Sequence, residues 1–484
     1  MITREAVEER FRLRRVPARW QGESPADFER LTADSRLTGP GDLFVAVAGL
    51  RSDGHSFIRD AARAGVAAAV VERPADLDLP QLVVPDTRVA LADLAMLWEG
   101  DPAAGMRLIG ITGTNGKTTT AWLVRHLLAG LGRSATLGTL GIVDAGGQRH
   151  PGELTTPDPL VLAGSLGILR DRGVELATME VSSHALDQRR VDGLRFDYAA
   201  FTSFSREHLD YHVEMASYRD AKLRFAELLA PGGVLVINGD EPAWDSLKAG
   251  PGEIVTTGFG DGLQVRAESV EALPRCTRFR LCGEYGDAVV ELPLIGRFNV
   301  ENALTAAGIA LHLGMPAAEV AERLGSVPQV PGRFEILSRE PVLVVRDYAH
   351  TPDAFRLALE ALRPLVQGRL IMVFGCGGDR DAGKRPLMGE VAGSLAGHVI
   401  VTSDNPRSED PEQIAAETVA RMDPSVYEIV LDRRDAIGRA LELAAPGDAV
   451  LLAGKGHETY QIVGNRKLPF DEAQVVAELR GEAA

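Results

Sequence analysis

The chain has 484 residues, and a typical domain size of about 150 residues predicts about three domains. Apolar residues make up 45% and charged residues 25%, a balance typical of globular proteins that excludes disorder along most of the chain. Because 68 Asp and Glu outnumber 52 Lys and Arg, the net charge is −16. This charge argues against a nucleic acid or an anionic membrane as partner, since both attract basic surfaces.

The three cysteines, Cys276, Cys282 and Cys376, are too few for a disulfide scaffold and lack the spacing of a metal site. Residues 1–17 contain no apolar core of a signal peptide, and no stretch has the roughly 18 uncharged apolar residues of a membrane span. We therefore expect reduced thiols and a cytoplasmic protein.

The first region, residues 1–104, is predicted to form a small α/β unit. Strands are expected at 42–49 and 81–86, a short helix leading into a strand at 61–71, and a helix at 89–98. The Gly and Pro content of 100–106 indicates a linker.

The second region, residues 105–331, opens with a strand at 107–112, a Gly-rich turn and a helix at 117–132. Further strands are expected at 176–181, 198–204 and 233–238, with short β segments between 253 and 295. A helix at 299–314 and a linker at 327–333 close this region.

The third region, residues 332–484, alternates strands and helices, such as the helix expected at 352–365. Continuous apolar strands separated by helices are typical of a buried, mostly parallel sheet, whose ligands bind beyond the carboxyl ends of the strands. The strands are expected at 342–349, 369–375, 398–404, 427–432 and 448–454. The candidate ligand loops are therefore 375–381, 403–407 and 453–458.

The segment 111–120 contains the strongest single motif, a glycine-rich loop between a strand and a helix. Gly113 and Gly116 allow backbone N–H groups to approach phosphate, Lys117 can reach the terminal phosphates, and the Thr118 hydroxyl can bind Mg²⁺. Since Ile111 stands where the full phosphate-loop pattern has glycine, the motif is a shortened variant. An ordinary βα turn is the alternative.

Polar residues at other strand ends are individually ambiguous. Glu180 lies where a second Mg²⁺-linked acid would lie, but it could equally form a salt bridge. The spacing of His208, Asp210 and His212 fits either a metal site or a polar helix cap. Lys222 on a predicted helix would by itself be a solvated lysine.

In the third region, several charged or Gly-rich loops follow strands. The loop at 347–354 contains Asp347, His350 and Asp353; 375–386 contains basic residues among glycines; Arg407 and Glu458 follow two further strands. Each could be a surface loop, but together at one sheet edge they predict a site for an anionic ligand.

Taken together these motifs resemble the Mur ligase family, the ATP-dependent amide ligases of peptidoglycan precursor synthesis. The similarity runs through GTNGKTTT, TTPD, MEVSSHAL, HLDYH, GRFNVENALTAAG, PGRFE, DYAHTPD, FGCGGDRDAGKRPLMG, DNPR and AGKGHE, which span most of the chain. The resemblance implies an α/β protein of three domains: an N-terminal domain for the UDP-linked substrate (1–104), a central P-loop ATPase domain (105–331) and a C-terminal Rossmann-like domain (332–484).

The resemblance is strongest to family members that add meso-2,6-diaminopimelate to UDP-N-acetylmuramoyl-L-alanyl-D-glutamate. It implies that ATP phosphorylates the D-Glu carboxylate and that an amine attacks the resulting acyl phosphate. The cofactors implied are ATP and Mg²⁺, and we expect a monomer that binds neither nucleic acid nor membrane. No general base for the amine is evident in the sequence.

Family roles transfer to matching positions in four groups. The ATP site would include Gly113, Thr114, Asn115, Gly116, Lys117, Thr118, Thr119, Asn299, Asn302, Arg333 and Asp347. Magnesium would be held by Thr118, Glu180, His208 and Lys222 as a carbamate, with Lys117, Lys222 and His208 catalytic. The UDP-substrate would contact Ser35, Thr155, Thr156, Ser182, Gln188 and Arg190. Diaminopimelate would contact Arg380, Asp404, Asn405, Pro406, Arg407, Gly454 and Glu458.

The chain departs from the common family pattern at Ser203, Phe204, Glu207 and Val213, close to the retained His208. Alternatives remain open: a lysine-adding ligase or a folylpolyglutamate synthase, a P-loop protein that switches partners with nucleotide, and a structural protein with a vestigial P-loop. The DNPR motif favours diaminopimelate, because a second carboxylate on the incoming amino acid calls for a bidentate Arg.

Overall fold

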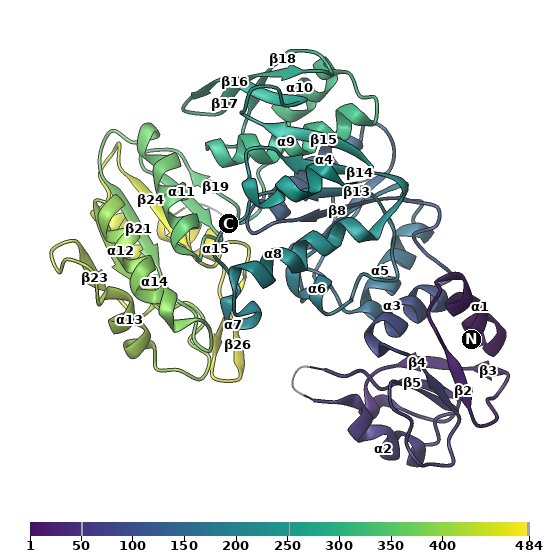
Figure 1. The fold of residues 1–484 in the computed structure, drawn as a ribbon. Coiled ribbons are helices and arrows are strands. Elements are labelled where there is room, and N and C mark those ends of the chain that lie inside the picture. Colours follow the sequence, from purple (N-terminus) through teal and green to yellow (C-terminus); the bar gives the residue numbers. More distant parts are fainter. Residues whose placement is uncertain (50–51, 251, 482–484) are drawn as a thin grey trace.

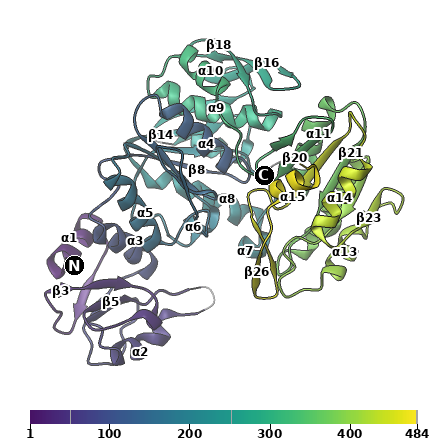
Figure 2. The ribbon, with the colours of Figure 1, turned by 180° about the vertical axis from the view of Figure 1, so that it is seen from behind.

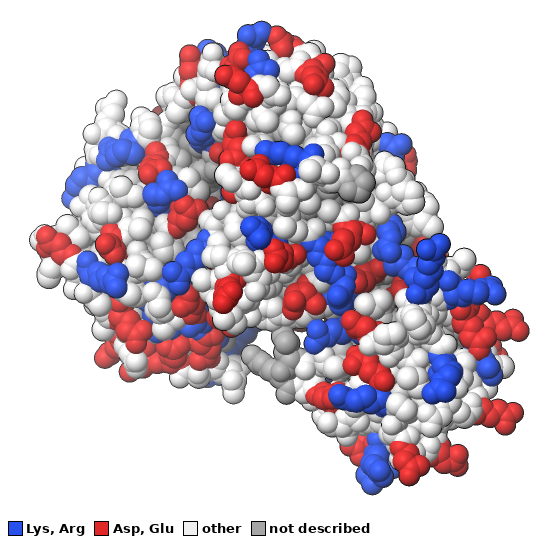
Figure 3. All heavy atoms as spheres, viewed as in Figure 1, with Lys and Arg blue, Asp and Glu red and all other residues white. Residues whose placement is uncertain are grey.

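The computed structural model describes residues 1–49, 52–250 and 252–481, and Figure 1 shows three α/β units following one another along the chain. No helix in these ranges is long and apolar enough to cross a membrane. On the face seen in Figure 3, acidic and basic side chains are interspersed.

The first unit is built on a sheet with the strand order β2-β7-β6-β5-β4, in which only β2 runs antiparallel to its neighbour. Its strands are β2 (Arg19–Gln21), β4 (Arg30–Thr32), β5 (Asp42–Val45), β6 (Ala68–Val71) and β7 (Gln81–Val83), with β1 (Ile2–Thr3) pairing β3 (Asp27–Phe28) beside it. Its helices are α1 (Arg4–Leu13), α2 (Ile58–Arg63) and α3 (Thr87–Trp98).

The central unit contains an eleven-stranded sheet in the order β11-β10-β9-β12-β8-β13-β14-β15-β16-β17-β18. The strands from β9 to β16 in this order are parallel, and both edges are antiparallel. The strands are β8 (Arg107–Thr112), β9 (Ser134–Gly138), β10 (Gly141–Val143), β11 (Arg149–His150), β12 (Leu176–Glu180), β13 (Phe196–Phe201), β14 (Leu229–Asn238), β15 (Glu253–Gly258), β16 (Val265–Ala272), β17 (Thr277–Gly283) and β18 (Ala288–Leu292). The helices are α4 (Lys117–Leu128), α5 (Pro159–Asp171), α6 (Ser183–Asp187), α7 (Leu209–His212), α8 (Met215–Leu223), α9 (Arg297–His312) and α10 (Ala317–Gly325).

The third unit has a six-stranded sheet in the order β19-β20-β24-β21-β22-β23, parallel except for the edge strand β19. Its strands are β19 (Glu335–Ser338), β20 (Leu343–Asp347), β21 (Leu370–Phe374), β22 (His398–Val401), β23 (Tyr427–Ile429) and β24 (Ala449–Ala453), and a hairpin of β25 (Tyr460–Val463) and β26 (Arg466–Pro469) follows. Its helices are α11 (Pro352–Leu362), α12 (Arg385–Leu395), α13 (Pro411–Val419), α14 (Arg433–Leu443) and α15 (Glu472–Leu479).

The apolar cores explain how the units are joined. One core runs without a break from the first unit through α3 and α5 onto the central sheet, and the views in Figures 1 and 2 both place α3 beside α5. The other face of the central sheet is covered by α4 and α9. The third sheet has separate cores on its two faces, with α11, α12 and α13 on one and α14 and α15 on the other.

The predicted α/β class and the mainly parallel third sheet are confirmed, and each expected strand coincides with an observed strand. Some elements are shorter than expected. The helix expected at 117–132 ends at Leu128, close to Gly130 and Gly132. The helix expected at 352–365 is α-helical only to Leu362 and ends in a 3₁₀ turn, where Pro364 has no N–H to continue it.

Candidate functional site

The phosphate-loop motif forms the turn between β8 and α4, as the sequence predicts. Gly116 caps α4 with a φ of 87°, and a Cβ there would lie 2.2 Å from Asn302 Oδ1 on α9. Only glycine permits both this conformation and this close approach. Asn302 Nδ2 in turn donates to Asn299 Oδ1 at 3.3 Å, so these two residues of α9 support the loop.

Two buried lysines meet at the loop carbonyls. Lys117 Nζ donates to Gly113 O at 2.9 Å and to Thr114 O at 2.7 Å, and Lys222 Nζ donates to the same Gly113 O at 2.6 Å. Burial lowers the pKa of Lys117, and burial together with the charge of Lys117 lowers the pKa of Lys222 well below its usual value.

A cavity of about 270 Å³ lies at this loop and extends to the third unit. Most of the residues that the sequence predicts for ATP, magnesium and the substrate carboxylate line it, from many separate stretches of the chain. They are Thr114, Asn115, Gly116, Lys117, Thr118, Thr119, Thr155, Glu180, Ser182, His208, Lys222, Asn299, Asn302, Arg333 and Asp347. Gly113 contributes its carbonyl oxygen to the two lysines.

The oxygen atoms in this cavity suit a magnesium ion. Thr118 Oγ1 donates to Glu180 Oε2 at 2.9 Å, and the backbone N–H of Thr139 fixes Glu180 Oε1 at 2.8 Å. Burial lowers the pKa of His208 to about 4, which leaves its imidazole neutral near pH 7. Hard oxygen ligands are the ones that Mg²⁺ prefers.

The alternative metal site at His208, Asp210 and His212 is not supported. No group of three His, Cys, Asp or Glu side chains able to hold a metal occurs among the described residues. His208 instead precedes the short helix α7, and His212 Nε2 hydrogen-bonds Ser183 Oγ at 3.0 Å. Of the three side chains, His208 lines the cavity and the other two do not.

Two buried nitrogens at the cavity have no hydrogen-bond partner within the described residues, and both suit a phosphate. They are Asn115 Nδ2 and Arg333 Nη1. Arg333 Nη2 donates to Thr118 Oγ1 at 3.1 Å, and Asp347 fixes the turn at Arg333 by accepting from the Phe334 N–H at 2.7 Å. Because buried donors are normally paired, these two atoms mark a place for an anionic ligand.

A second cavity, of about 440 Å³, lies between the first and central units. It is lined by Gln188, Arg190, Asp158 and Pro159 of the central unit and by Ala33, Val47, Gly49, Arg88 and Leu91 of the first. Arg190 binds Gln188 Oε1 and donates to Thr156 O at 2.9 Å, and Thr156 Oγ1 donates to Glu180 O at 2.9 Å. Thr156 lines neither cavity, but its hydrogen bonds link Arg190 of the second cavity to Glu180 of the first. Ser35 lines neither cavity.

The predicted amino-acid loops all leave the carboxyl edge of the third sheet. Arg407 has a φ of 52°, and its Nη1 donates to Gly378 O at 2.7 Å, which joins the loop after β22 to the loop after β21. Neither Nε nor Nη2 of Arg407 forms a hydrogen bond in the part of the chain that the structure describes. Arg380 is exposed, Pro406 is buried, and Gly454 begins the loop after β24.

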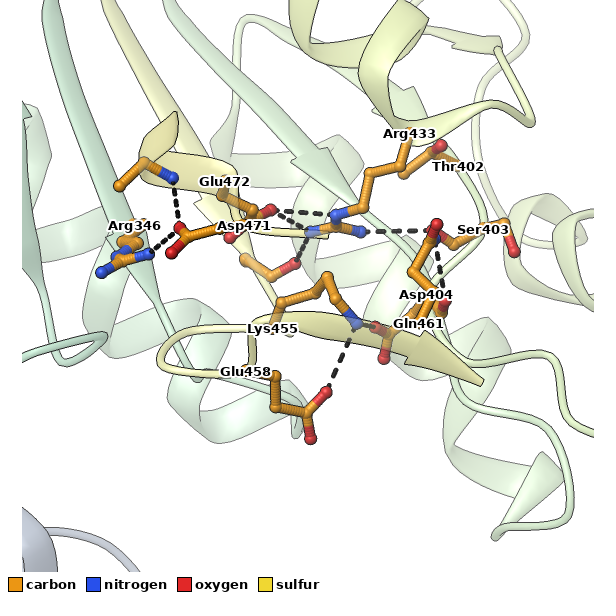
Figure 4. Close-up of polar contacts among 12 residues, drawn as sticks. Arg346, Thr402, Ser403, Asp404, Arg433, Lys455, Glu458, Gln461, Asp471 and Glu472 are labelled. Atoms are coloured by element: carbon orange, nitrogen blue, oxygen red, sulfur yellow. Dashed lines mark hydrogen bonds and ion pairs between the residues drawn. The ribbon is translucent and has the colours of Figure 1, made fainter. Parts of the chain in front are cut away.

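Beneath these loops lies a residue that sequence reasoning missed, Lys455. Figure 4 shows its ammonium between Asp404 and Glu458, at 3.1 and 3.3 Å. Deeper in, the fully buried Arg433 binds Glu472 and donates to the carbonyl of Ala453 at 2.8 Å. The lysine was visible in AGKGHE, but only the fold reveals that it is buried.

Tyr348 links the first cavity to these loops. It lines the cavity, the Arg333 guanidinium lies 4.3 Å from its ring centroid, and the His457 ring lies 5.2 Å away. Burial raises the pKa of its hydroxyl, and the negative charges of Glu458 and Asp404 raise it further. A Cβ at Gly332 would lie 2.0 Å from the His457 backbone nitrogen, so the PGR turn fits closely against AGKGHE.

The four departures from the family pattern are accommodated. Ser203 Oγ accepts from the Asn115 N–H at 3.1 Å, and Phe204 stacks on Tyr218. Glu207 Oε1 binds His350 Nε2 of the third unit at 3.0 Å. Val213 is exposed and has a φ of 66°. Of the loop 347–354, His350 therefore faces the central unit, whereas Asp353 pairs with Arg356 on its own helix.

Known families match nearly every part of the chain. A model described as Mur ligase middle domain matches residues 111–310, one described as Mur ligase, glutamate ligase domain matches 332–456, and one described as Mur ligase family, catalytic domain matches 27–97.

Relatives that match along nearly the whole chain point to the same family. The UDP-N-acetylmuramoyl-L-alanyl-D-glutamate–2,6-diaminopimelate ligase of Geobacillus thermodenitrificans (strain NG80-2) is 43% identical over 96% of this chain and 97% of its own. The protein of the same name from Parasynechococcus marenigrum (strain WH8102) is 44% identical over 92% and 93%. A solved structure of a ligase with this name is 34% identical, covers 94% of both chains and has a TM-score of 0.67. The chain belongs to the Mur ligase family.

Proposed function

We propose that this chain joins meso-2,6-diaminopimelate to the D-glutamate of UDP-N-acetylmuramoyl-L-alanyl-D-glutamate at the expense of ATP, in peptidoglycan precursor synthesis. The family and the printed names of its relatives support an ATP-dependent amide ligase of this kind. The observation that carries the choice of amino acid is the cluster of Arg407, Asp404 and Glu458 beyond one sheet edge, because it offers partners for both a carboxylate and an ammonium.

A carboxylate is a poor electrophile, so the reaction begins with transfer of the ATP γ-phosphoryl group to the D-Glu side chain. The loop N–H groups at 114–118 and the ammonium of Lys117 offset the charge on the transferring group. Arg333, whose Nη1 is unpaired within the described residues, adds a cation from the third unit. The amine of diaminopimelate then attacks the acyl phosphate, and inorganic phosphate leaves.

The cavity residues fit magnesium, and we assign Thr118, Glu180, His208 and Lys222 as the residues that would hold it. Bound there, the ion would neutralise negative charge on phosphate oxygens. Lys222 fits this role as a carbamate: its lowered pKa favours the neutral amine that reacts with carbon dioxide, and the product is an anion where the free ammonium would repel a metal.

The second cavity, lined by Gln188 and Arg190, fits the UDP-linked substrate, and Thr155 and Ser182 of the first cavity would meet the dipeptide end together with Thr156. Ser35 would lie toward the uridine. In this arrangement the dipeptide carboxylate enters the first cavity past Thr156. We also propose that the enzyme acts in the cytoplasm as a monomer, which size-exclusion chromatography with light scattering would test.

One assay tests the function directly. The purified chain is supplied with ATP, Mg²⁺, UDP-N-acetylmuramoyl-L-alanyl-D-glutamate and one amino acid at a time, while phosphate release and product mass are followed. We expect kcat/KM for meso-diaminopimelate to exceed that for L-lysine by at least about 100-fold. Equal use of L-lysine contradicts the proposed amino acid, and nucleotide-dependent partner binding without amide product contradicts ligation.

A further inference from the structure

The amino-acid loops enclose a lysine that has no role in the reaction described above. Lys455 has no solvent-exposed surface, and its Nζ lies 3.1 Å from Asp404 Oδ1, 3.3 Å from Asn405 Oδ1 and 3.3 Å from Glu458 Oε2. An ammonium removed from water is costly unless oxygens surround it, and here three do so. Its surroundings are therefore built for a charged lysine.

Lys455 binds one carboxylate oxygen of Asp404 and one of Glu458, and it leaves the other oxygen of each without a contact to the lysine. Asn405 Nδ2 also donates to Glu458 Oε2, at 2.9 Å, so this oxygen has two donors. Asp404 Oδ2 and Glu458 Oε1 bind nothing among the described residues, although their side chains are only 13% and 15% exposed. These two oxygens are the acceptors that remain for a ligand (Figure 4).

The charges indicate what kind of ligand group fits. One ammonium and two carboxylates leave a net charge of −1, which a single further ammonium balances. Without Lys455 the two acids would repel each other, and one side chain would turn away from the other.

The loops themselves are fixed by other contacts. Arg433 is fully buried, donates to Ala453 O just before the loop of Lys455, and pairs with Glu472 of α15 at 2.8 Å. Arg407 N donates to Ile462 O at 3.1 Å and joins the loop of Asp404 to the hairpin after Glu458. Removal of the Lys455 ammonium therefore acts on the two acids more than on the path of the backbone.

We propose that Lys455 is a positioning residue for amino-acid specificity: it holds Asp404 and Glu458 so that their free oxygens bind the ammonium of diaminopimelate farthest from the new amide bond. This rests on the proposed function. Arg407 would bind the carboxylate at the same end, so the two charged groups at that end are recognised separately.

Two analogues separate these contacts. L-2-Aminopimelate keeps the far carboxylate and lacks the far amine, whereas L-lysine keeps the far amine and lacks the carboxylate. In the wild type we expect kcat/KM for diaminopimelate to exceed that for L-2-aminopimelate by at least about 100-fold. In Lys455→Met this ratio should fall at least tenfold, through a higher KM for diaminopimelate, while the diaminopimelate-to-lysine ratio and the KM for ATP change less than threefold.

The matched control is Lys467→Met, which removes an exposed lysine that lies over the ring of Tyr460 in the neighbouring hairpin. This variant should keep the wild-type ratios of kcat/KM for diaminopimelate to those for L-2-aminopimelate and L-lysine. A merely structural Lys455 would lower the melting temperature and slow all three substrates alike. A Lys455→Met enzyme with the wild-type preference for diaminopimelate over L-2-aminopimelate would overturn the proposal, as would a wild type without that preference.

Should Lys455→Met not fold, Lys455→Met combined with Glu458→Gln removes one cation and one anion together and keeps the net charge. This variant should also lose the preference over L-2-aminopimelate, and its retention would equally overturn the proposal. If the wild type does not consume diaminopimelate at all, the proposed function is contradicted, and with it the proposal for Lys455. This outcome is distinguishable from a changed substrate preference, because no product forms.

Discussion

Two lysine side chains in the first cavity donate hydrogen bonds to the same carbonyl oxygen. Lys117 and Lys222 both bind Gly113 O, from α4 and α8 respectively. Burial lowers the pKa of both side chains, and the charge of Lys117 lowers the pKa of Lys222 further. Of the two, Lys222 has the pKa that is lowered well below its usual value, so it is the side chain favoured as a neutral amine.

Lys117→Ala should reduce ligation by about 10³-fold, because the cation nearest the transferring phosphoryl group is lost. The fold should be kept, since the lysine binds only carbonyls of its own loop. Phosphate release and a thermal melt measure the two effects. Lys248→Ala, which removes an exposed lysine paired with Asp245, serves as the control and should keep full activity.

Lys222 is expected to be carbamylated in the active enzyme. After incubation with ¹³C-bicarbonate, NMR should show a carbamate resonance that is missing in Lys222→Ala. The same variant should lose most of its activity and regain part of it with acetate, which supplies the missing carboxylate. A wild type that is fully active and shows no such resonance would contradict this assignment.

Arg407→Ala should lower kcat/KM for diaminopimelate by about 30- to 1000-fold, the equivalent of about 2–4 kcal/mol. The physical reason is that the substrate carboxylate would lose a fork of N–H donors, of which Nε and Nη2 have no other partner among the described residues. The KM for ATP should be unchanged, since Arg407 lies beyond β22 and does not line the ATP cavity. A parallel loss with L-lysine, which has no such carboxylate, would indicate loop damage instead.

At the scale of elements, the turn after α7 is strained. Val213 has φ 66° and ψ −50°, and Glu214 N donates to His212 O at 2.7 Å, the geometry of a tight γ-turn that β-branched residues disfavour. Such strain costs about 1–3 kcal/mol. Glycine at this position would adopt the same conformation without strain.

Val213→Gly should therefore raise the free energy of unfolding by about 1 kcal/mol, after the entropy that glycine adds to the unfolded chain is subtracted. Calorimetry of the first unfolding transition would measure it. The matched control, Val289→Gly, replaces an exposed valine within β18 and should destabilise the protein by a similar amount. No gain at Val213 would mean that the turn relaxes in solution.

The elements that sequence reasoning found and missed differ in a physical way. Strands such as β8, β21 and β24 are continuous apolar runs because the sheet is covered on both faces, and they are visible in the sequence. Helix α5 was missed because Gly164 and Gly167 interrupt a segment whose buried side is recognisable only against α3. The hairpin strands β10 and β11 are too short to show a periodic pattern.

The site divides in the same manner. Phosphate-loop residues and the loops beyond β21, β22 and β24 could be predicted, because a strand end and a motif fix them locally. The roles of Tyr348, His457 and Lys455 could not, since they depend on which loops the fold brings together. The meeting of Glu207 with His350 depends on how the second and third units are joined, which no local pattern encodes.

At the scale of the whole molecule, the third unit makes polar contacts with the central unit at the first cavity. Arg333 donates to Thr118 Oγ1, and His350 Nε2 binds Glu207 Oε1. Burial alone would raise the pKa of Glu207, but the hydrogen bond from His350 and the positive charge of Lys117 act against burial, and the pKa is lowered. Glu207 is therefore an anion, and His350 of the third unit forms its hydrogen bond to a charged group of the central unit.

Glu207 and His350 should therefore act as one unit in catalysis. Glu207→Gln and His350→Gln should each lower kcat/KM, and the double variant should be little worse than either single one. The expected coupling energy is about 1 kcal/mol, or roughly fivefold in kcat/KM, because each change alone already breaks the contact that draws the third unit onto ATP. Asp353→Asn and Arg356→Gln, an ion pair within α11, form the control cycle and should show a coupling below about 0.5 kcal/mol. Additive losses at Glu207 and His350 would show that the units close over ATP without this pair.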